Sequence, residues 1–488
     1  MSYPLSVNSV DDFVFNHLSI LYWFSLSLLL ASMYMIAVTF ENKFLRWIMT
    51  VGIVMAMYST SYFYYSLSTA DANLFGGLNE YFAKARILDF SQVGKSYFQW
   101  PAFFILTDIA TSVSGLELAN FEFLMYTIIG FLLTTTLYIY ASKAYKNGGF
   151  LAVVAFFIAM FSFLNFQFVA FTIAFGLLLL LLTLDTQRWN SSMILTMLVL
   201  FTSMTLTHAF VPLFFVIFLL IKSIISRNKQ YGVFFLLTLI IYLVYQITST
   251  NNALESYIRL MQSFSTEIPR MVGVKPVFVP IDAIAQKFFV AILITTVTIC
   301  VAGFIILLIK RKMRDLDKAV FLTGAVYFGL GVMLWVLGSR AIPLAFIPVS
   351  LGASYLFGTR FKPYLKSFFL VLLILFSFIS LHASFANEIF VRTKESYTAE
   401  NFFIDHWTNR SFTLANWWVA DYFESKLTLR AYAFSRDPLM IKEVDTIFYT
   451  VTLGLQMRDF NYTIEKIINE ERLNVVYSSG SSIVATRS

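Results

Sequence analysis

The sequence predicts an all-α polytopic membrane protein of about twelve transmembrane helices, followed by a small extracytoplasmic α/β domain at the C-terminus. Three observations predict this fold. Of the 488 residues, 58% are hydrophobic and only 13% are charged, whereas roughly a quarter of the residues in soluble proteins are charged. Apolar runs of about twenty residues, the length that crosses a bilayer as a helix, recur along residues 1–386. Charges of both signs return at ordinary density only over 387–488.

The spans follow one another closely, and several pairs have almost no linker. They are predicted at 18–40, 47–67, 121–141, 150–166, 168–184, 191–207, 209–225, 233–248, 288–309, 319–337, 341–357 and 367–386. The first seventeen residues lack the basic region and cleavage site typical of a signal peptide, so the first run is expected to be a retained span. No internal repeat of the kind that builds many transporters is evident.

The basic residues predict the orientation. They gather in short connections on one side of the spans, and they are Lys43, Arg46, Lys143, Lys146, Arg188, Lys222, Arg227, Lys229, Lys310, Arg311, Lys312, Arg314, Lys318, Arg360, Lys362 and Lys366. The positive-inside rule places that side in the cytoplasm. The loops 68–116 and 251–287 and the C-terminal tail are therefore expected outside, in a multi-pass protein of the cell membrane.

The net charge of +7 is explained by these connections, so the expected partner is the lipid bilayer and no nucleic acid. The single cysteine, Cys300, lies within an apolar run, which excludes a disulfide framework and a cysteine-ligated metal site. The low cysteine content, the dense Ile, Leu and Phe and the outer tail favour an archaeal origin, and a bacterial origin stays open.

The outer loop 68–116 interrupts the apolar pattern. Its apolar residues recur at helical spacing, and they are Leu74, Leu78, Tyr81, Phe82, Ala85 and Leu88. The polar residues fall largely on the other side, and they are Asn73, Asn79, Glu80, Lys84 and Arg86. This pattern predicts an amphipathic helix at the membrane surface. Gln99-Trp100-Pro101 then interrupts the chain, and a second short helix is predicted over 102–113, ending near Ser114-Gly115.

In this loop the sequence resembles a known family. Residues 58–67 leading into Asp71, then Tyr97-Phe98-Gln99-Trp100-Pro101 and Ser112-Val113-Ser114-Gly115-Leu116, resemble the first outer loop of the GT-C superfamily of membrane glycosyltransferases. That superfamily includes protein mannosyltransferases, aminoarabinose transferases and the catalytic subunit of oligosaccharyltransferases. The resemblance implies a polyprenyl- or dolichyl-phosphate-linked sugar donor, a protein, lipid or glycan acceptor, an outward-facing active site and an essential acid, which is carried over onto Asp71.

The chemistry of such a donor also explains why one acid suffices. A phosphate leaving group departs without being protonated, whereas glycoside hydrolysis must protonate an alkoxide and usually needs two carboxylates. Asp71 can then act as the base that takes the proton of the acceptor. The alternative for Asp71 is a helix cap for the segment that follows. Glu80 and Asp108 are candidate secondary acids, although Glu80 with Lys84 is also a spacing typical of a solvated helix face.

Cations near the phosphate would stabilise its developing charge. Lys84 and Arg86 are candidates, and Arg340 in Gly338-Ser339-Arg340-Ala341-Ile342-Pro343 is the preferred phosphate ligand because it resembles an Arg that lines the lipid-donor site of oligosaccharyltransferases. The alternative for Arg340 is an interfacial side chain reaching for lipid headgroups.

His208 at another outer turn, and Trp100, are candidate contacts to the donor or acceptor, and His208 could equally be a satisfied residue at a helix end.

The cofactor stays open. Oligosaccharyltransferases hold a divalent ion with acids from two outer loops, but the second such loop here, 162–168, carries no carboxylate, which favours metal-free chemistry. If Mg²⁺ or Mn²⁺ is bound, Asp71 is its expected ligand.

The tail should contain a helix over 462–472 and a hairpin over 474–485. Trp417 and Trp418 stand where oligosaccharyltransferases carry an acceptor motif, but Val419 and Ala420 separate them from Asp421, so peptide recognition is not carried over. A noncatalytic lipid-binding scaffold of envelope assembly and a transporter or flippase remain as alternatives.

Overall fold

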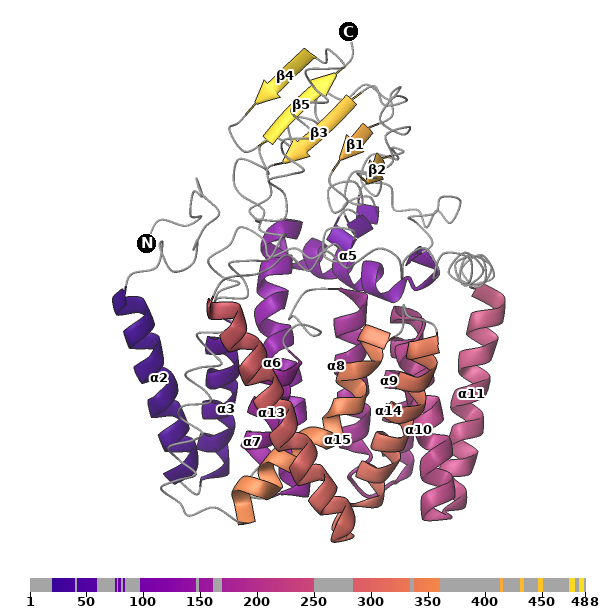
Figure 1. Ribbon diagram of the computed structural model, residues 1–488. Coiled ribbons are helices and arrows are strands. Elements are labelled where there is room, and N and C mark those ends of the chain that lie inside the picture. Colours follow the sequence, from indigo (N-terminus) through magenta and orange to yellow (C-terminus); the bar gives the residue numbers. More distant parts are fainter. Residues whose placement is uncertain are drawn as a thin grey trace.

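The computed structural model contains a bundle of apolar helices and a C-terminal sheet (Figure 1). The structure describes residues 20–39, 42–58, 75–76, 78–79, 82–83, 97–145, 149–160, 169–249, 284–333 and 338–359, and five strands between 413 and 486. The helices are α2 (Ile20–Thr39), α3 (Lys43–Met57), α5 (Ala102–Ser114), α6 (Leu118–Ala144), α7 (Gly149–Ala159), α8 (Ala170–Leu184), α9 (Ser191–Thr207), α10 (Val211–Ser226), α11 (Lys229–Ser249), α13 (Ile284–Ile309), α14 (Asp315–Met333) and α15 (Gly338–Thr359). Each predicted span up to 341–357 overlaps one of these helices. The later parts of the spans predicted at 47–67, 150–166 and 319–337, and the whole of 367–386, lie outside the described residues.

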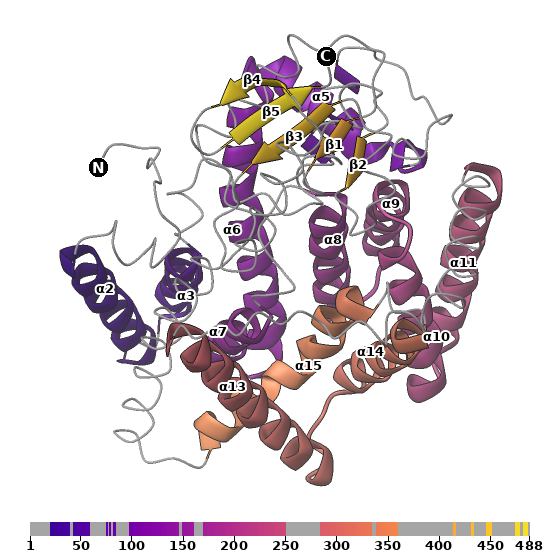
Figure 2. The same ribbon diagram turned by 45° about the horizontal axis from the view of Figure 1, so that its top comes forward.

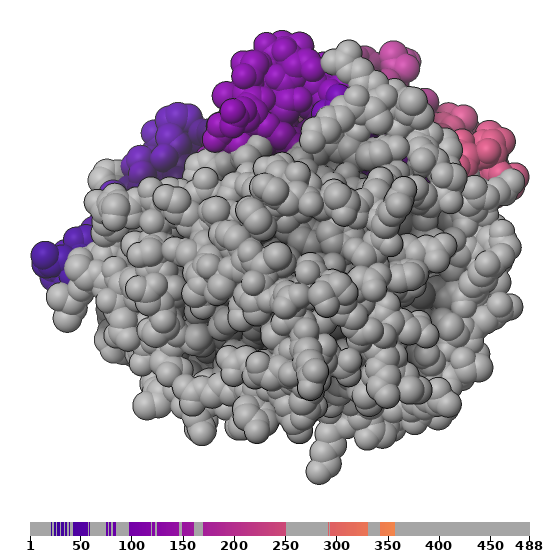
Figure 3. Space-filling model, turned by 90° about the horizontal axis from the view of Figure 1, so that it is seen from above, coloured from indigo at the N-terminus to yellow at the C-terminus, as the bar shows by residue number. Residues whose placement is uncertain are grey.

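The helices pack as a layered bundle (Figures 1 and 2). One row of neighbours runs from α2 through α3 and α6 to α8 and α9, while α7 packs against α3, α6, α13 and α15. A second group forms where α10 contacts α8, α11 and α14, and α14 contacts α15. The helix α5 lies across one end of the bundle (Figure 1). Figure 3 views the molecule from this α5 end and shows purple side chains of the region around α5 and α6 between the indigo N-terminal helices and pink residues near the end of α11.

Local signals explain where several helices begin and end. The Asn42 side chain accepts hydrogen bonds from the N–H groups of Phe44 and Leu45 at the start of α3, and Asn190 accepts one from Met193 at the start of α9. Such bonds satisfy donors that lack a partner in the first helical turn. The helix α5 starts after Pro101 and ends at Gly115, whose φ of 68° is left-handed and favours glycine. The predicted second short helix of the loop is therefore present with nearly the predicted bounds.

The apolar surface indicates a membrane environment. Of the helices in the described ranges, Asn120–Ala144 and Lys229–Ser249 are long and apolar enough to cross a bilayer, and shorter apolar helices of 10–17 residues accompany them. Large apolar side chains stand exposed along one face of α11, and they are Val233, Leu236, Ile240, Val244 and Ile247. Contiguous exposed apolar area of this kind is unfavourable in water and suits contact with lipid. The chain is a multi-pass membrane protein.

Two ion-pair clusters with buried carboxylates lie at the bundle end opposite α5. Lys222 on α10 pairs with Asp185, which follows α8, and each residue is only 5% exposed. The Lys222 ammonium also lies 4.2 Å from the centre of the Tyr231 ring on α11. Burial raises the pKa of the Asp185 carboxyl, and the Lys222 ammonium opposes that shift. Lys222, predicted as a cytoplasmic basic residue, is therefore an internal link among three helices.

The second cluster centres on Asp317, which is 3% exposed at the start of α14. Arg314 binds it through two nitrogens, each 2.7 Å from a carboxylate oxygen, and the Tyr140 hydroxyl on α6 donates a third hydrogen bond over 2.7 Å. A carboxylate so completely partnered is well accommodated in a low-dielectric site. The connection before α14 is thereby held against α6.

The crossing of α13 and α15 depends on two glycines. A Cβ added at Gly352 would overlap the Cys300 carbonyl oxygen and the Phe304 backbone nitrogen, and a Cβ at Gly303 would overlap the backbone of Gly352. Backbone atoms cannot yield as a flexible side chain can, so the two helices touch only because both Cβ atoms are missing.

We expect Gly352→Ala to destabilise the protein by about 3 kcal/mol, since overpacked cores lose roughly this much. The readout is thermal unfolding of the purified protein in detergent. Gly329→Ala on α14 is the matched control, because a Cβ there meets nothing within 4 Å. Equal melting temperatures for the two variants would contradict the close crossing.

The C-terminal strands form one mixed sheet in the order β2-β1-β3-β5-β4. They are β1 (Thr413–Ala415), β2 (Ala431–Ala433), β3 (Thr446–Thr450), β4 (Asn474–Ser478) and β5 (Ser482–Thr486). β1 pairs in parallel with β2 and β3, while β5 pairs antiparallel with β3 and β4. The antiparallel pair β4–β5 is the hairpin expected over 474–485. The predicted helix 462–472, Trp417 and Trp418 lie outside the described residues, and the domain boundary at 386/387 stays a prediction.

Candidate functional site

Aromatic packing holds the described parts of the 68–116 loop together at the α5 end. Phe75 packs against Tyr97, with 5.1 Å between ring centres, and against Phe103 on α5 at 5.3 Å. Phe98 packs on Phe104 at 4.8 Å. These rings are largely buried, so apolar burial helps to fix the early segment of the loop against the turn before α5.

Asn79 shows where the predicted amphipathic pattern fails. Leu78 and Phe82 are buried, as their spacing predicts, but Asn79 was expected on the polar side and is only 3% exposed. Its Nδ2 lies 3.5 Å from Oε1 of Glu122 on α6. A buried amide is tolerated when it finds a polar partner, and here the partner comes from a distant element. The prediction for Asn79 was wrong for that reason.

His208 ends α9 and begins the turn into α10. Its Nδ1 accepts hydrogen bonds from the backbone N–H groups of Phe210 at 3.1 Å and Val211 at 3.4 Å. A nitrogen that accepts carries no proton, so in the neutral ring the proton is on Nε2. His208 thus caps α10, as the alternative interpretation expected. It also lines the pocket described next, and its contact with the donor or acceptor stays a prediction.

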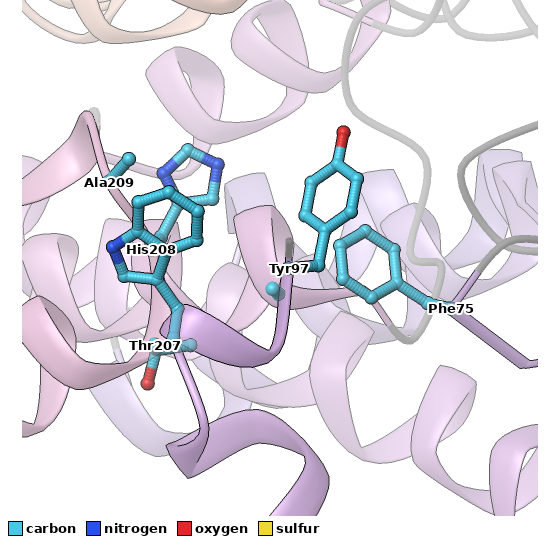
Figure 4. Close-up of a pocket in the computed structure, with 7 residues that line it drawn as sticks. Phe75, Tyr97, Thr207, His208 and Ala209 are labelled. Carbon is cyan, nitrogen blue, oxygen red and sulfur yellow. The ribbon is translucent and has the colours of Figure 1, made fainter. Parts of the chain in front are cut away.

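The pocket lies between the loop and the α9–α10 turn. Its lining includes Phe75, Tyr97, Trp100, Ala170, Thr207, His208 and Ala209. In Figure 4, Phe75 and Tyr97 lie on one side and Thr207, His208 and Ala209 on the other. The cavity measures about 20 Å³, and the empty space counted together with its open mouth is about 300 Å³. The pocket joins segments that are more than 100 residues apart in the sequence.

Trp100 contributes an unusual donor to this lining. The residue is 5% exposed, and its indole Nε1 has no hydrogen-bond partner among the residues that the structure describes. The backbone at Trp100 is fixed, because its N–H donates to the Tyr97 carbonyl over 3.0 Å and the Tyr245 hydroxyl on α11 donates to the carbonyl of the preceding Gln99. An unpaired buried N–H is costly, so this one is suited to an acceptor supplied by a ligand or by water.

The other predicted site residues do not all meet here. Asp108 is half-buried on α5 and does not line the pocket. Arg340 belongs to the first turn of α15. Asp71, Glu80, Lys84 and Arg86 lie outside the described residues, so their predicted roles stay predictions.

Arg340 nevertheless lies at the bundle end that carries the pocket. The Tyr327 hydroxyl on α14 donates a hydrogen bond to the Phe210 carbonyl, next to the pocket residue Ala209. From Tyr327 the helix α14 continues away from the Asp317 cluster, and α15 begins five residues after α14 ends. The start of α15 is therefore on the pocket side of the bundle.

A metal site is not formed by the residues with described positions, where no group of three or more His, Cys, Asp and Glu side chains lies together. Asp71, the expected ligand, is not among them.

Sequence reasoning missed Phe75 and Ala170. Phe75 falls outside the predicted apolar stripe, and Ala170 is one small apolar residue near the start of the predicted span 168–184. No local signal marks either one, because each contributes only by where another segment packs.

Solved structures with a similar architecture are known. ArnT from Cupriavidus metallidurans in the apo state is 10% identical, and the match covers 90% of this chain and 97% of that chain at a TM-score of 0.50. ArnT from the same organism bound to undecaprenyl phosphate is 10% identical, with coverage of 96% and 98% and a TM-score of 0.49. The apo oligosaccharyltransferase from Archaeoglobus fulgidus is 10% identical, with coverage of 89% and 70% and a TM-score of 0.44.

No protein-family model matches the sequence, and no curated protein matches it. At this level of identity the likeness to apo ArnT concerns the fold alone. The chain has a fold similar to that of apo ArnT.

Proposed function

We propose that this protein is an integral-membrane glycosyltransferase that moves a sugar from a polyprenyl- or dolichyl-phosphate-linked donor to a protein, lipid or glycan acceptor on the extracytoplasmic face. The observation that carries the proposal is the fold match to apo ArnT across 90% of this chain. The resemblance of the 68–116 loop to the first outer loop of the same superfamily supports it independently, because that resemblance depends on local residues and the fold match on the whole bundle.

The pocket suits the proposed chemistry because one of its lining residues is close to Asp71 in the sequence. Asp71 precedes Phe75 by four residues, so covalent geometry limits the separation of their Cα atoms to about 14 Å. Phe75 itself lines the pocket. In the proposal, the Asp71 carboxylate accepts the proton of the acceptor as the acceptor oxygen attacks the anomeric carbon of the sugar, and the lipid phosphate leaves with the electron pair of the broken bond.

The phosphate needs a cation at the moment it leaves. Arg340 fits this role because its guanidinium keeps its charge and can bind phosphate through two nitrogens. Lys84 and Arg86 follow the buried Phe82 by two and four residues, so they share its loop and are proposed to assist.

The sequence of the loop 162–168 favours transfer without a divalent ion. We expect activity in washed membranes to survive excess EDTA. Loss of activity in EDTA that Mn²⁺ or Mg²⁺ restores would contradict this expectation and would make Asp71 the first ligand to test.

The function is tested by comparing cells with and without the gene. Mass spectrometry of envelope glycans and of lipid-linked sugars should show one sugar missing from an acceptor and the matching polyprenyl-phosphate sugar accumulating. Unchanged glycans and donor lipids would contradict the proposal and favour a scaffold. A donor lipid that only changes sides of the membrane would indicate a flippase.

A further inference from the structure

The indole N–H of Trp100 is the starting point of a further inference. It is a buried donor beside a cavity, and the described residues supply no acceptor for it. A Trp N–H can only donate. Whatever fills the cavity next to it must therefore present an oxygen, or another acceptor, to gain the hydrogen bond.

The size of the cavity limits the occupant to one small group. A volume of about 20 Å³ holds about one water molecule or one hydroxyl group. A whole sugar ring does not fit inside, so only one of its substituents would enter the cavity, while the ring would stay at the open side of the pocket, where the empty space totals about 300 Å³. Thr207 adds polarity, since its hydroxyl proton is directed to the Ser203 carbonyl over 2.7 Å and its oxygen keeps acceptor capacity.

We propose that this cavity is a specificity pocket for one uncharged hydroxyl group of a sugar, which accepts a hydrogen bond from Trp100 Nε1. The inference rests on the proposed function for its substrate class, because the sugar is that of the donor or of a glycan acceptor. The pocket selects against a protonated amino group at the same position. An ammonium has three donors and no acceptor, so it cannot accept a hydrogen bond from the indole N–H and would leave that donor unpaired.

The test measures sugar binding directly and needs no transfer activity. Saturation-transfer difference NMR is recorded on the full-length protein in lipid nanodiscs, free of sugar-headed detergent, with a panel of methyl pyranosides, their monodeoxy derivatives and amino-sugar analogues. We expect at least one methyl pyranoside to bind, one of its monodeoxy derivatives to bind about tenfold more weakly, and the amino sugar with nitrogen at that same position to lose binding.

Trp100→Phe should reproduce the loss, weakening the best glycoside about tenfold while abolishing the difference from its deoxy derivative. Trp47→Phe is the matched control, because Trp47 Nε1 donates to Thr135 Oγ1 over 3.0 Å between α3 and α6, away from the pocket lining. The control should keep wild-type sugar binding even if it melts earlier. A panel without any binder, or equal binding by the two variants, would overturn the proposal and leave only a structural water at Trp100.

The two sources of the sugar are separated by competition with a polyprenyl-phosphate sugar. Displacement of the bound glycoside assigns the pocket to the sugar of the donor, while simultaneous binding assigns it to the acceptor. If the protein binds sugar through Trp100 but has no transfer activity, the proposed enzymatic function is contradicted and the proposed hydroxyl pocket is still supported.

Discussion

Replacement of Asp71 by Asn should lower the rate of sugar transfer in isolated membranes by about 10²- to 10⁴-fold. The amide keeps the shape of the carboxylate but cannot take the proton of the acceptor. Binding of the lipid-linked donor should change little, because in the proposed mechanism Arg340, Lys84 and Arg86 bind the phosphate and Asp71 does not. The measurement is initial-rate transfer from a radiolabelled polyprenyl-phosphate sugar, normalised to the amount of protein in the membrane.

The control for this variant is Glu117→Gln. Glu117 is an exposed acid at the start of α6 in the same connection, and its replacement should change the rate by less than about twofold. Full transfer by Asp71→Asn at normal expression would rule out the catalytic role and reduce Asp71 to a helix cap. Full complementation of a deletion strain by the same variant would point to the noncatalytic scaffold.

Replacement of Lys222 by Met should cost about 3–5 kcal/mol of stability, because it leaves the carboxylate of Asp185 buried and without its counter-ion. The loss should shrink as the pH falls. Burial raises the pKa of Asp185, and removing the ammonium that opposes this shift raises it further. The folded variant then binds a proton more tightly than the unfolded chain does, so its stability falls as the pH rises. Thermal unfolding across a pH series measures both effects.

Two further variants isolate the cause. The double variant Lys222→Met/Asp185→Leu removes both charges and should recover most of the lost stability, since a buried pair replaced by apolar groups is often neutral. Lys318→Met is the control for an exposed ion pair, because the Lys318 ammonium lies 2.8 Å from the carboxylate of Asp315 at the protein surface. This variant should change the stability by about 0–1 kcal/mol. A double variant as unstable as Lys222→Met alone would contradict the role of the buried charge.

The helices were predictable because the length of an apolar run is a local property of the sequence. The run 191–207 coincides with α9 at both ends, and the turn at His208 was expected where it is found. The short helix after Pro101 was predictable for the same reason, since proline and glycine restrict the backbone where they stand. One loop likewise led to the expectation of a fold like that of aminoarabinose transferases and their relatives, and the fold is similar to that of apo ArnT.

The pocket and the ion pairs were decided by tertiary packing. Lys222 was recognisable as a basic residue, but its partner Asp185 is 37 positions away and meets it only because α8 and α10 pack side by side. Asn79 was misassigned because its partner Glu122 belongs to α6. Trp100 and His208 were named as contacts from the sequence, while the cavity that joins them needs walls from Phe75 and Ala170. A run of residues specifies its own helix through local hydrophobicity and backbone preference, but a cavity is the space left between segments, and only their packing defines it.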